Sequence, residues 1–197
     1  MFKCNNVPLI ENPTGIDRVV QDLQESVANI SWIEYSFGKS FTRKKMLEDG
    51  RVSRLPYVYD EKREYLKVTP DDTVTAFSFV EVDTQETYTN YSTFNPSWNI
   101  EQDMSLVVFA NLQKIDDEDY IFTERLKEEV LDVVRRLGWV LNINSTTKGL
   151  EDTWTNYTYT EFKEKYFNEN FSTFKVNLTA KFSRDCFTGN NFSKTTC

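Results

Sequence analysis

Nine residues near the end of the chain alternate strictly between apolar and polar side chains. The apolar ones are Phe174, Val176, Leu178, Ala180 and Phe182, and the polar ones between them are Lys175, Asn177, Thr179 and Lys181. Successive side chains of a β-strand point to opposite faces of a sheet. The pattern therefore predicts a strand over 174–182 with one buried face and one polar face.

Two other segments, 74–82 and 106–110, carry apolar side chains on both faces. Strands that are buried on both faces belong in the centre of a sheet, so we expect these two segments there. Since only one face of the 174–182 segment is apolar, we place that strand at the outside of the same sheet.

Apolar residues recur at helical spacing in 16–30 and again in 122–137, and a shorter helical pattern covers 162–167. The acidic run 116–119 directly precedes the second long pattern. Four acids can bind a cation such as calcium, but acids also gather at helix N-termini, and the twelve-residue calcium-loop pattern is absent. We favour the helix start.

These segments predict an α+β fold in which a small, mostly antiparallel or mixed β-sheet is flanked by two long helices and one short helix. Residues 1–186 form a single domain in this interpretation, with long loops at 83–103 and 144–158, the first of them either an extended loop or a hairpin excursion. Residues 187–197 are polar and aperiodic, and we expect a flexible C-terminal tail.

The composition argues against most enzyme classes. The chain contains no histidine, which excludes Ser-His-Asp and Cys-His nucleophilic systems and most zinc hydrolases. Glycine-rich nucleotide motifs are absent, and Cys4, Cys186 and Cys197 match neither zinc-site nor disulfide spacing. We therefore predict no enzyme activity and no catalytic, metal-binding or cofactor-binding residues, although 31 acids leave a carboxylate-based hydrolase open.

A formal charge of −8 argues against broad binding to the phosphate backbone of nucleic acids. The local exception is the basic run 43–45, with Arg51 and Arg54 nearby, which either contacts an acidic partner or DNA or forms a solvated hairpin tip around 48–50. The chain has no apolar run near the roughly 20 residues that a bilayer requires, so we predict no membrane contact. The first residues do not form a secretory signal, which favours the cytoplasm.

Aromatic residues are frequent in the two predicted loops. They can anchor a protein interface, pack within the loops or form a sugar-binding platform, and assembly with neighbours suits two loops that emerge from one sheet. The residues concerned are Tyr88, Tyr91, Phe94, Trp98, Trp154 and Tyr157.

Several stretches of the chain resemble one known family over roughly residues 14–186. They are Gly15-Ile16-Asp17-Arg18 to Leu23-Gln24, Trp32, Tyr35-Ser36-Phe37-Gly38-Lys39, Ala76-Phe77-Ser78-Phe79, Ser105-Leu106-Val107-Val108-Phe109 before the acidic helix, Trp154-Thr155-Asn156-Tyr157-Thr158, and Phe174-Lys175-Val176 with Cys186. In these stretches the chain resembles the tail-completion, or tail-terminator-like, proteins at the neck of tailed bacteriophages, including versions in crAss-like and other Bacteroides-type phages.

The resemblance implies a structural protein of the virion, made in the host bacterial cytoplasm, that forms a homo-oligomeric ring at the head-to-tail connector. Its neighbours would be portal or adaptor and tail proteins, and DNA would pass through the ring without specific binding. A connector ring in a short-tailed virion fits equally, and a carbohydrate-binding or adhesin-like module is the alternative. The expected interface residues are the six aromatic ones together with Lys175 and Lys181.

Overall fold

A computed structural model describes residues 10–59, 64–89, 99–115, 123–158 and 170–183. The elements follow one another as α1 (Ile16–Ala28), β1 (Tyr35–Met46), β2 (Val52–Tyr59), β3 (Tyr65–Lys67), β4 (Ala76–Thr89), β5 (Asn99–Asn111), α2 (Leu112–Ile115), α3 (Thr123–Arg135), β6 (Val140–Lys148), α4 (Leu150–Thr153) and β7 (Phe171–Ser183).

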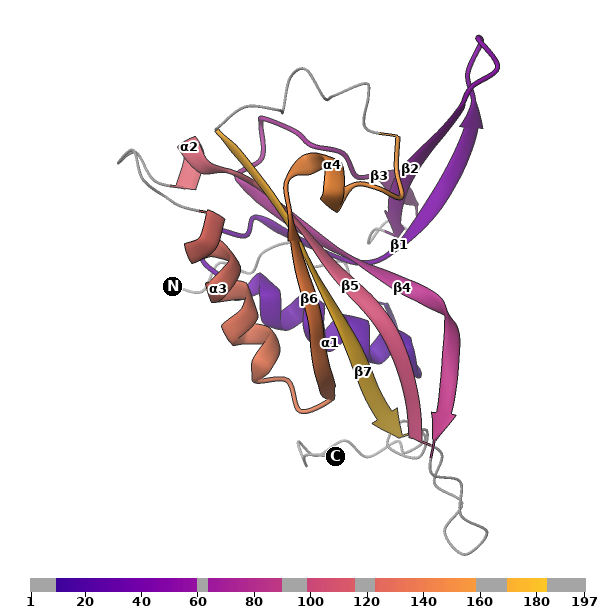
Figure 1. Ribbon diagram of the computed structural model, residues 1–197, viewed down its shortest axis with the longest axis vertical. Helices are drawn as coiled ribbons and strands as arrows, with labels where there is room; N and C mark the ends of the chain where they lie inside the picture. The colour runs from indigo at the N-terminus through magenta and orange to yellow at the C-terminus, as the bar shows by residue number, and fades with distance from the viewer. Residues whose placement is uncertain (1–9, 60–63, 90–98, 116–122, 159–169, 184–197) are drawn as a thin grey trace, which may run out of the picture.

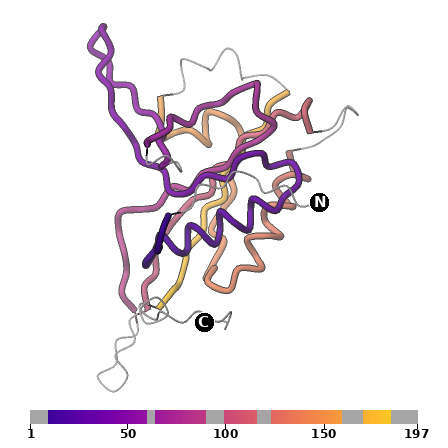
Figure 2. The backbone as a smooth tube through the Cα atoms, turned by 180° about the vertical axis from the view of Figure 1, so that it is seen from behind, coloured from indigo at the N-terminus to yellow at the C-terminus, as the bar shows by residue number. Residues whose placement is uncertain are grey.

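The strands form one seven-stranded sheet in the order β3-β2-β1-β4-β5-β7-β6 (Figure 1). The pair β1 and β4 is parallel, and the other neighbouring pairs are antiparallel. The pairing of β1 with β4 runs only from Tyr35 to Lys39, after which β1 continues with β2 as a two-stranded hairpin. This hairpin projects from the body of the sheet in both backbone views (Figures 1 and 2).

The predicted fold class is wrong. The sheet is the main part of the molecule, and only α1 and α3 among the four helices of the described chain are longer than one turn. These two helices do not flank the sheet on opposite sides, because both pack into the same apolar cluster against one face. The opposite face carries a separate cluster, which includes Leu150 of α4.

The helix-covered face is held by aliphatic side chains at helical spacing. Val19, Leu23 and Val27 of α1 recur every four residues and are almost fully buried. Leu126 and Val130 of α3 repeat that spacing, and both sets pack against the same side of β4, β5 and β7. The amphipathic pattern therefore identified the buried side of each long helix.

Two tryptophans connect the regions of α1 and α3 reciprocally. Trp32, which follows α1, donates from Nε1 to Oε2 of Glu129 on α3 over 2.8 Å. Trp139, which follows α3, donates from Nε1 to Oδ2 of Asp22 on α1 over 2.7 Å. Each indole thus reaches a carboxylate of the other helix, which fixes the two helices as one layer.

The alternating segment 174–182 is a strand, as predicted, and lies within β7. Its predicted position at the outside of the sheet is wrong, because β7 pairs with β5 on one side and β6 on the other. The edge strand is β6, which begins in the predicted short strand and continues to Lys148.

The predicted long loop at 144–158 is wrong over the described residues, and so is an extended loop at 83–103. Residues 83–89 extend β4 and residues 99–103 begin β5, and the two pair antiparallel, which fits the alternative of a hairpin excursion. Within 144–158, β6 runs to Lys148 and the helix α4 follows. The side of these strands on which no long helix packs is polar. This polarity is the reason why the sequence pattern indicated loops.

Several predicted features lie outside the described residues. They are the acidic run 116–119, the short helical pattern 162–167, the tail 187–197, and Cys4, Cys186 and Cys197. In the described part of the chain, no helix is long and apolar enough to cross a membrane.

Candidate functional site

One half of the sheet face opposite the long helices is aromatic. Phe77 and Phe79 of β4 lie beside Val107 and Phe109 of β5, and the ring centroids of Phe77 and Phe109 are 5.1 Å apart. The fully buried Trp154, which follows α4, lies with its ring centroid 5.7 Å from that of Phe79. We call this covered region the aromatic half.

The same face becomes polar further along the same strands, because β4 continues from Phe79 to Glu81 and Asp83. The cross-strand register aligns these positions with polar residues on three more strands. We call this region the polar half, and its members are Glu81, Asp83, Glu101, Asp103, Ser105, Asn144, Ser145, Lys175, Asn177, Thr179 and Lys181.

Hydrogen bonds run across the strands of the polar half in two rows. In the first, Ser105 Oγ donates to Asn177 Oδ1 over 2.7 Å, and Asn177 Nδ2 donates to Ser145 Oγ over 2.9 Å. In the second, Asn144 Nδ2 donates to Thr179 Oγ1 over 3.0 Å, and Thr179 Oγ1 donates to Asp103 Oδ1 over 2.5 Å. These bonds fix the side chains of the polar half in place.

Two ion pairs connect β7 to its neighbours within the polar half. Lys175 Nζ lies 2.6 Å from Glu81 Oε2, and the two side chains are only 11% and 14% exposed. Lys181 Nζ lies 3.2 Å from Glu101 Oε1, and these side chains are 34% and 26% exposed. Since Glu81 also accepts from Asn156 Nδ2 over 3.3 Å, the inner pair belongs to a small polar network.

Tyr157 lies where the two halves meet. Its ring packs against Phe79 and Trp154 in the aromatic half, and its hydroxyl is 3.4 Å from Ser40 Oγ. Burial, followed by the charge of the nearby Glu81, raises the pKa of the Tyr157 phenol well above its ordinary value. The phenol therefore stays neutral beside the charged pair.

Two carboxylates of the polar half have no cationic partner among the described residues. Asp83 accepts from the backbone N–H of Gln85, and Asp103 accepts only from Thr179. Both side chains are exposed. They line a hollow of about 450 Å³, together with Ser105 and Asn177 among others. No three side chains of the metal-ligating types come together in the described part of the chain.

The hairpin of β1 and β2 beyond Ser40, which we call the arm, exposes an unusual set of side chains. Its strands end in a turn in which Leu47 N–H donates to Arg51 O over 2.8 Å, close to the predicted tip at 48–50. One face of the arm carries the opposed pair Met46 and Val52, which are 70% and 46% exposed. Such exposure is uncommon for a paired apolar couple.

The next opposed pair on that face of the arm is Lys44 and Arg54. Like charges directly opposite each other destabilise a strand pair. Neither residue has an acidic partner in the ranges described. Arg43, on the other face, differs because its guanidinium lies 4.8 Å from the ring centroids of both Tyr57 and Tyr65.

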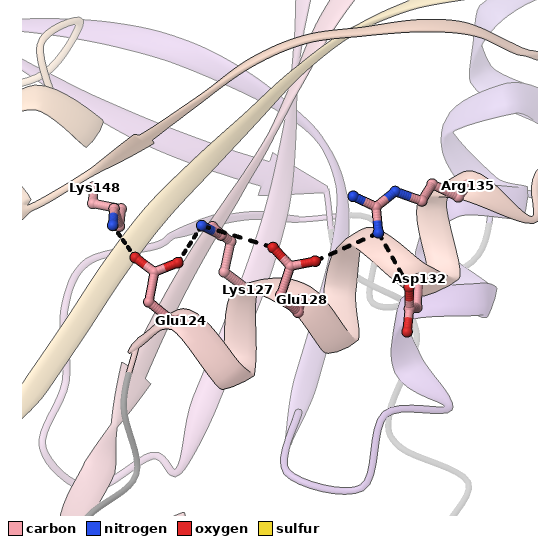
Figure 3. A network of polar contacts seen from close by, with 6 residues as sticks. All are labelled: Glu124, Lys127, Glu128, Asp132, Arg135 and Lys148. Carbon is pink, nitrogen blue, oxygen red and sulfur yellow. Dashed lines mark hydrogen bonds and ion pairs between the residues drawn. The ribbon is translucent and has the colours of Figure 1, made fainter.

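A separate charged network follows the exposed side of α3 and reaches β6 (Figure 3). Glu124 accepts from both Lys127 and Lys148, and Glu128 and Asp132 pair with Arg135. The hydrogen bonds that Glu124 accepts from Lys127 and, to a smaller extent, from Lys148 lower its pKa to about 2. The network fastens the start of α3 to the end of β6, so we regard it as structural.

The residues predicted to form an interface divide into four groups. Tyr88 is exposed near the end of β4, and Lys175 and Lys181 lie in the polar half but are paired with acids. Trp154 and Tyr157 are buried in the aromatic half, so their prediction as exposed anchors is wrong. Tyr91, Phe94 and Trp98 lie outside the described residues.

The sequence pattern indicated the basic run 43–45, but it did not predict that Met46 and Val52 share a face with Lys44 and Arg54. Their common face follows from the register of the two strands, which the Asp49-Gly50 turn signal alone does not fix. Asp83 and Asp103 were missed as a pair because they lie 20 positions apart in a segment that read as a loop.

No protein-family model matches the chain, and no curated protein sequence is significantly similar to it.

Proposed function

We propose that the protein is a structural subunit that assembles with copies of itself into a ring at the head-to-tail connector of a tailed bacteriophage. The observation that carries the assembly is the arm. The place in the virion, with portal or adaptor and tail proteins as neighbours and DNA passing without specific binding, comes from the sequence resemblance. The protein has a structural role in this proposal and catalyses no reaction.

The arm favours assembly because the described chain supports its base more than its outer part: Val58 packs in the aromatic half, and Thr158 N–H donates to Arg54 O over 2.7 Å. A two-stranded hairpin is marginally stable by itself and gains stability by packing against another surface. The outer part of this arm exposes Met46 and Val52 and sets Lys44 against Arg54. A neighbouring molecule that covers the apolar pair and neutralises the cations would remove both disadvantages.

The edges of the sheet support the same proposal. Beyond Ser40, the described pairings leave β1 with β2 as its sole neighbour, so a row of backbone groups is open to another chain. At the opposite edge, β6 has two register shifts, which make an edge strand a poor template for simple strand addition. The two edges differ, and unlike contact surfaces generate rings when the rotation closes.

The overall charge is compatible with a channel for DNA. With a net charge of −8, the chain would repel phosphate on average, and a ring that lets DNA pass should not hold it tightly. The alternative of a carbohydrate-binding module loses support, since Trp154 and Tyr157 have no exposed ring face for stacking a sugar.

Light scattering on a sizing column, combined with electron microscopy of the full chain, tests the assembly. We expect closed rings for the wild type. A variant in which residues 45–53 are replaced by Asn-Gly, a turn suited to two-residue hairpins, should be folded by circular dichroism but monomeric. A wild type that stays monomeric at high concentration would contradict the proposal.

The place in the virion needs its own test. Immunogold labelling of phage particles made from a genome that carries the gene should place the gold at the head-to-tail junction. Label on the capsid or along the tail fibres, or particles without label, would overturn the virion assignment while leaving the assembly intact.

A further inference from the structure

The described chain carries unpaired charges of opposite sign on two separate surfaces. On the arm, Lys44 and Arg54 lack acidic partners, and in the polar half Asp83 and Asp103 lack cationic ones. The other charged members of the polar half are already matched, because Lys175 pairs with Glu81 and Lys181 with Glu101. On the arm face that carries Met46 and Val52, the unmatched cations are Lys44 and Arg54, and in the polar half the unmatched carboxylates are Asp83 and Asp103.

These two surfaces cannot neutralise each other within one molecule. The arm points towards one end of the molecule, whereas the later part of β4 and the first part of β5 run towards the other end (Figure 1). Charges separated by more than about 10 Å in salt are largely screened. Contact between the surfaces therefore requires two copies of the chain.

Each pair of unmatched charges is gathered at one place on its surface. Lys44 and Arg54 are directly opposed on neighbouring antiparallel strands. Asp83 and Asp103 directly follow and precede the opposed pair Val82 and Met104, at a register shift of the β4–β5 ladder, and both line the same hollow. The two carboxylates are therefore presented together on one surface, as the two cations are on the arm.

We propose that the arm of one subunit docks on the polar half of the next, with Lys44 and Arg54 against Asp83 and Asp103. Met46 and Val52 then lie over the hollow beside the carboxylates and lose their contact with water. The partner is thus a second copy of this chain in a head-to-tail contact. This inference rests on the proposed ring and names the two surfaces that close it.

The decisive experiment uses two charge-reversed chains. The variant K44E/R54E has an acidic arm and an acidic polar half, and the variant D83K/D103K has a basic arm and a basic polar half. Each variant alone is expected to be folded but monomeric in native mass spectrometry and electron microscopy. Mixed in equal amounts, the two are expected to form rings in which the chains alternate, because every arm then meets a polar half of opposite charge.

A matched control separates this contact from the effect of net charge. R125E/R136E changes the net charge by the same amount as K44E/R54E, at exposed positions on and just after α3. It is expected to assemble as the wild type does. Raising the salt concentration should weaken the wild-type ring and the mixed ring to a similar extent, since both depend on the same charge pairs.

The outcomes distinguish the inference from the proposed function. Wild-type rings together with folded variants that assemble alone, or with a mixture that stays monomeric, would overturn the docking of arm on polar half and leave the ring standing. The basic residues of the arm could instead contact DNA. If K44E/R54E still formed rings but lost binding to DNA in a gel-shift assay, the docking would also be overturned. A wild type without rings would instead remove the proposed function itself.

Discussion

The two halves of one sheet face show how the same strands can serve different purposes. In the aromatic half, Phe79 and Phe109 are completely buried, and the ring of Trp154 packs against Phe79. Two residues further along β4, Glu81 begins the polar half, which α4 does not cover and which exposes Asp83. The opposite face of these strands is mostly apolar along both halves, with Ser78 and Gln102 as buried polar exceptions, because α1 and α3 pack there.

The comparison shows that burial on this face depends on the covering layer and not on the strand. β4 and β5 continue as regular pairs through the change from aromatic to polar side chains. Apolar burial supplies stability in the covered half, whereas hydrogen bonds and ion pairs organise the uncovered half. The ladder of β4 and β5 therefore carries both kinds of surface, and its register shifts only beyond Val82 and Met104.

The largest test of this difference is Trp154→Ala in the aromatic half. Removing a fully buried tryptophan leaves a cavity, and we expect the free energy of unfolding to fall by about 4 kcal/mol in urea denaturation. The matched control is Tyr88→Ala, which truncates an exposed ring and should change stability by less than about 0.5 kcal/mol. Equal losses in the two variants would mean that the covered half has no special role in stability.

The second test concerns the inner ion pair of the polar half. Glu81→Gln leaves the mostly buried Lys175 without its partner, and we expect a loss of about 3 kcal/mol in the free energy of unfolding. The double variant E81L/K175M removes both charges and should be close to the wild type. The more exposed pair Lys181 and Glu101 provides the control, since E101Q should cost only about 1 kcal/mol.

A double variant as unstable as E81Q would contradict that interpretation. The loss would then come from the shape of Glu81, including its hydrogen bond with Asn156, rather than from an unpaired charge. The polar half would in that case depend on a specific network and not on charge balance.

The dependence on a covering layer also explains what the sequence could predict. The strand within β7 was predictable because one of its faces is buried along its whole length and a period of two is visible locally. The stretch from Thr84 to Thr89 is also a strand, but most of its side chains are exposed, so it shows no buried face and resembles a loop. Periodicity reports burial, and it finds a strand only where something covers one face.

Positions in the sheet and at the site were harder to predict for a related reason. The prediction that the 174–182 strand lies at the outside of the sheet was wrong. The strand β6, which contains Asn142, Asn144 and Ser145, pairs with the side of β7 that faces away from β5. Trp154 looked like an interface anchor because its neighbours in sequence are polar, yet the turn at α4 directs it into the aromatic half. Both features depend on contacts between residues far apart in the chain.

The boundary between the halves gives a smaller effect, visible at alkaline pH. The raised pKa of Tyr157 keeps its phenol neutral in the folded protein, while in the unfolded chain it ionises near pH 10. This contribution to stability is complete below pH 10 and is lost as the pH rises above it, by about 1.4 kcal/mol per pH unit. Unfolding curves of Y157F between pH 9 and 11 should decline less steeply than those of the wild type. If the curves of Y157F and the wild type were parallel, the phenol of Tyr157 would be in contact with solvent.

The smallest effect is expected at Glu124, where an exposed charge network provides a contrast with the inner pair of the polar half. The pKa of Glu124 is about 2 in the folded protein and near 4.5 in the absence of its lysine partners. Its contribution is therefore fully present above pH 4.5 and is lost as the pH falls towards 2. In urea denaturation, E124Q should lack this part of the acid sensitivity and differ little from the wild type below pH 2.

Salt provides a second comparison of the two sites. Because Glu124 is exposed, 0.5 M NaCl should reduce the difference in stability between E124Q and the wild type at neutral pH, whereas the loss caused by E81Q should persist in salt. Equal sensitivity to salt at both sites would mean that the polar half is as open to solvent as the surface of α3, and the distinction between a built surface and an ordinary one would fail.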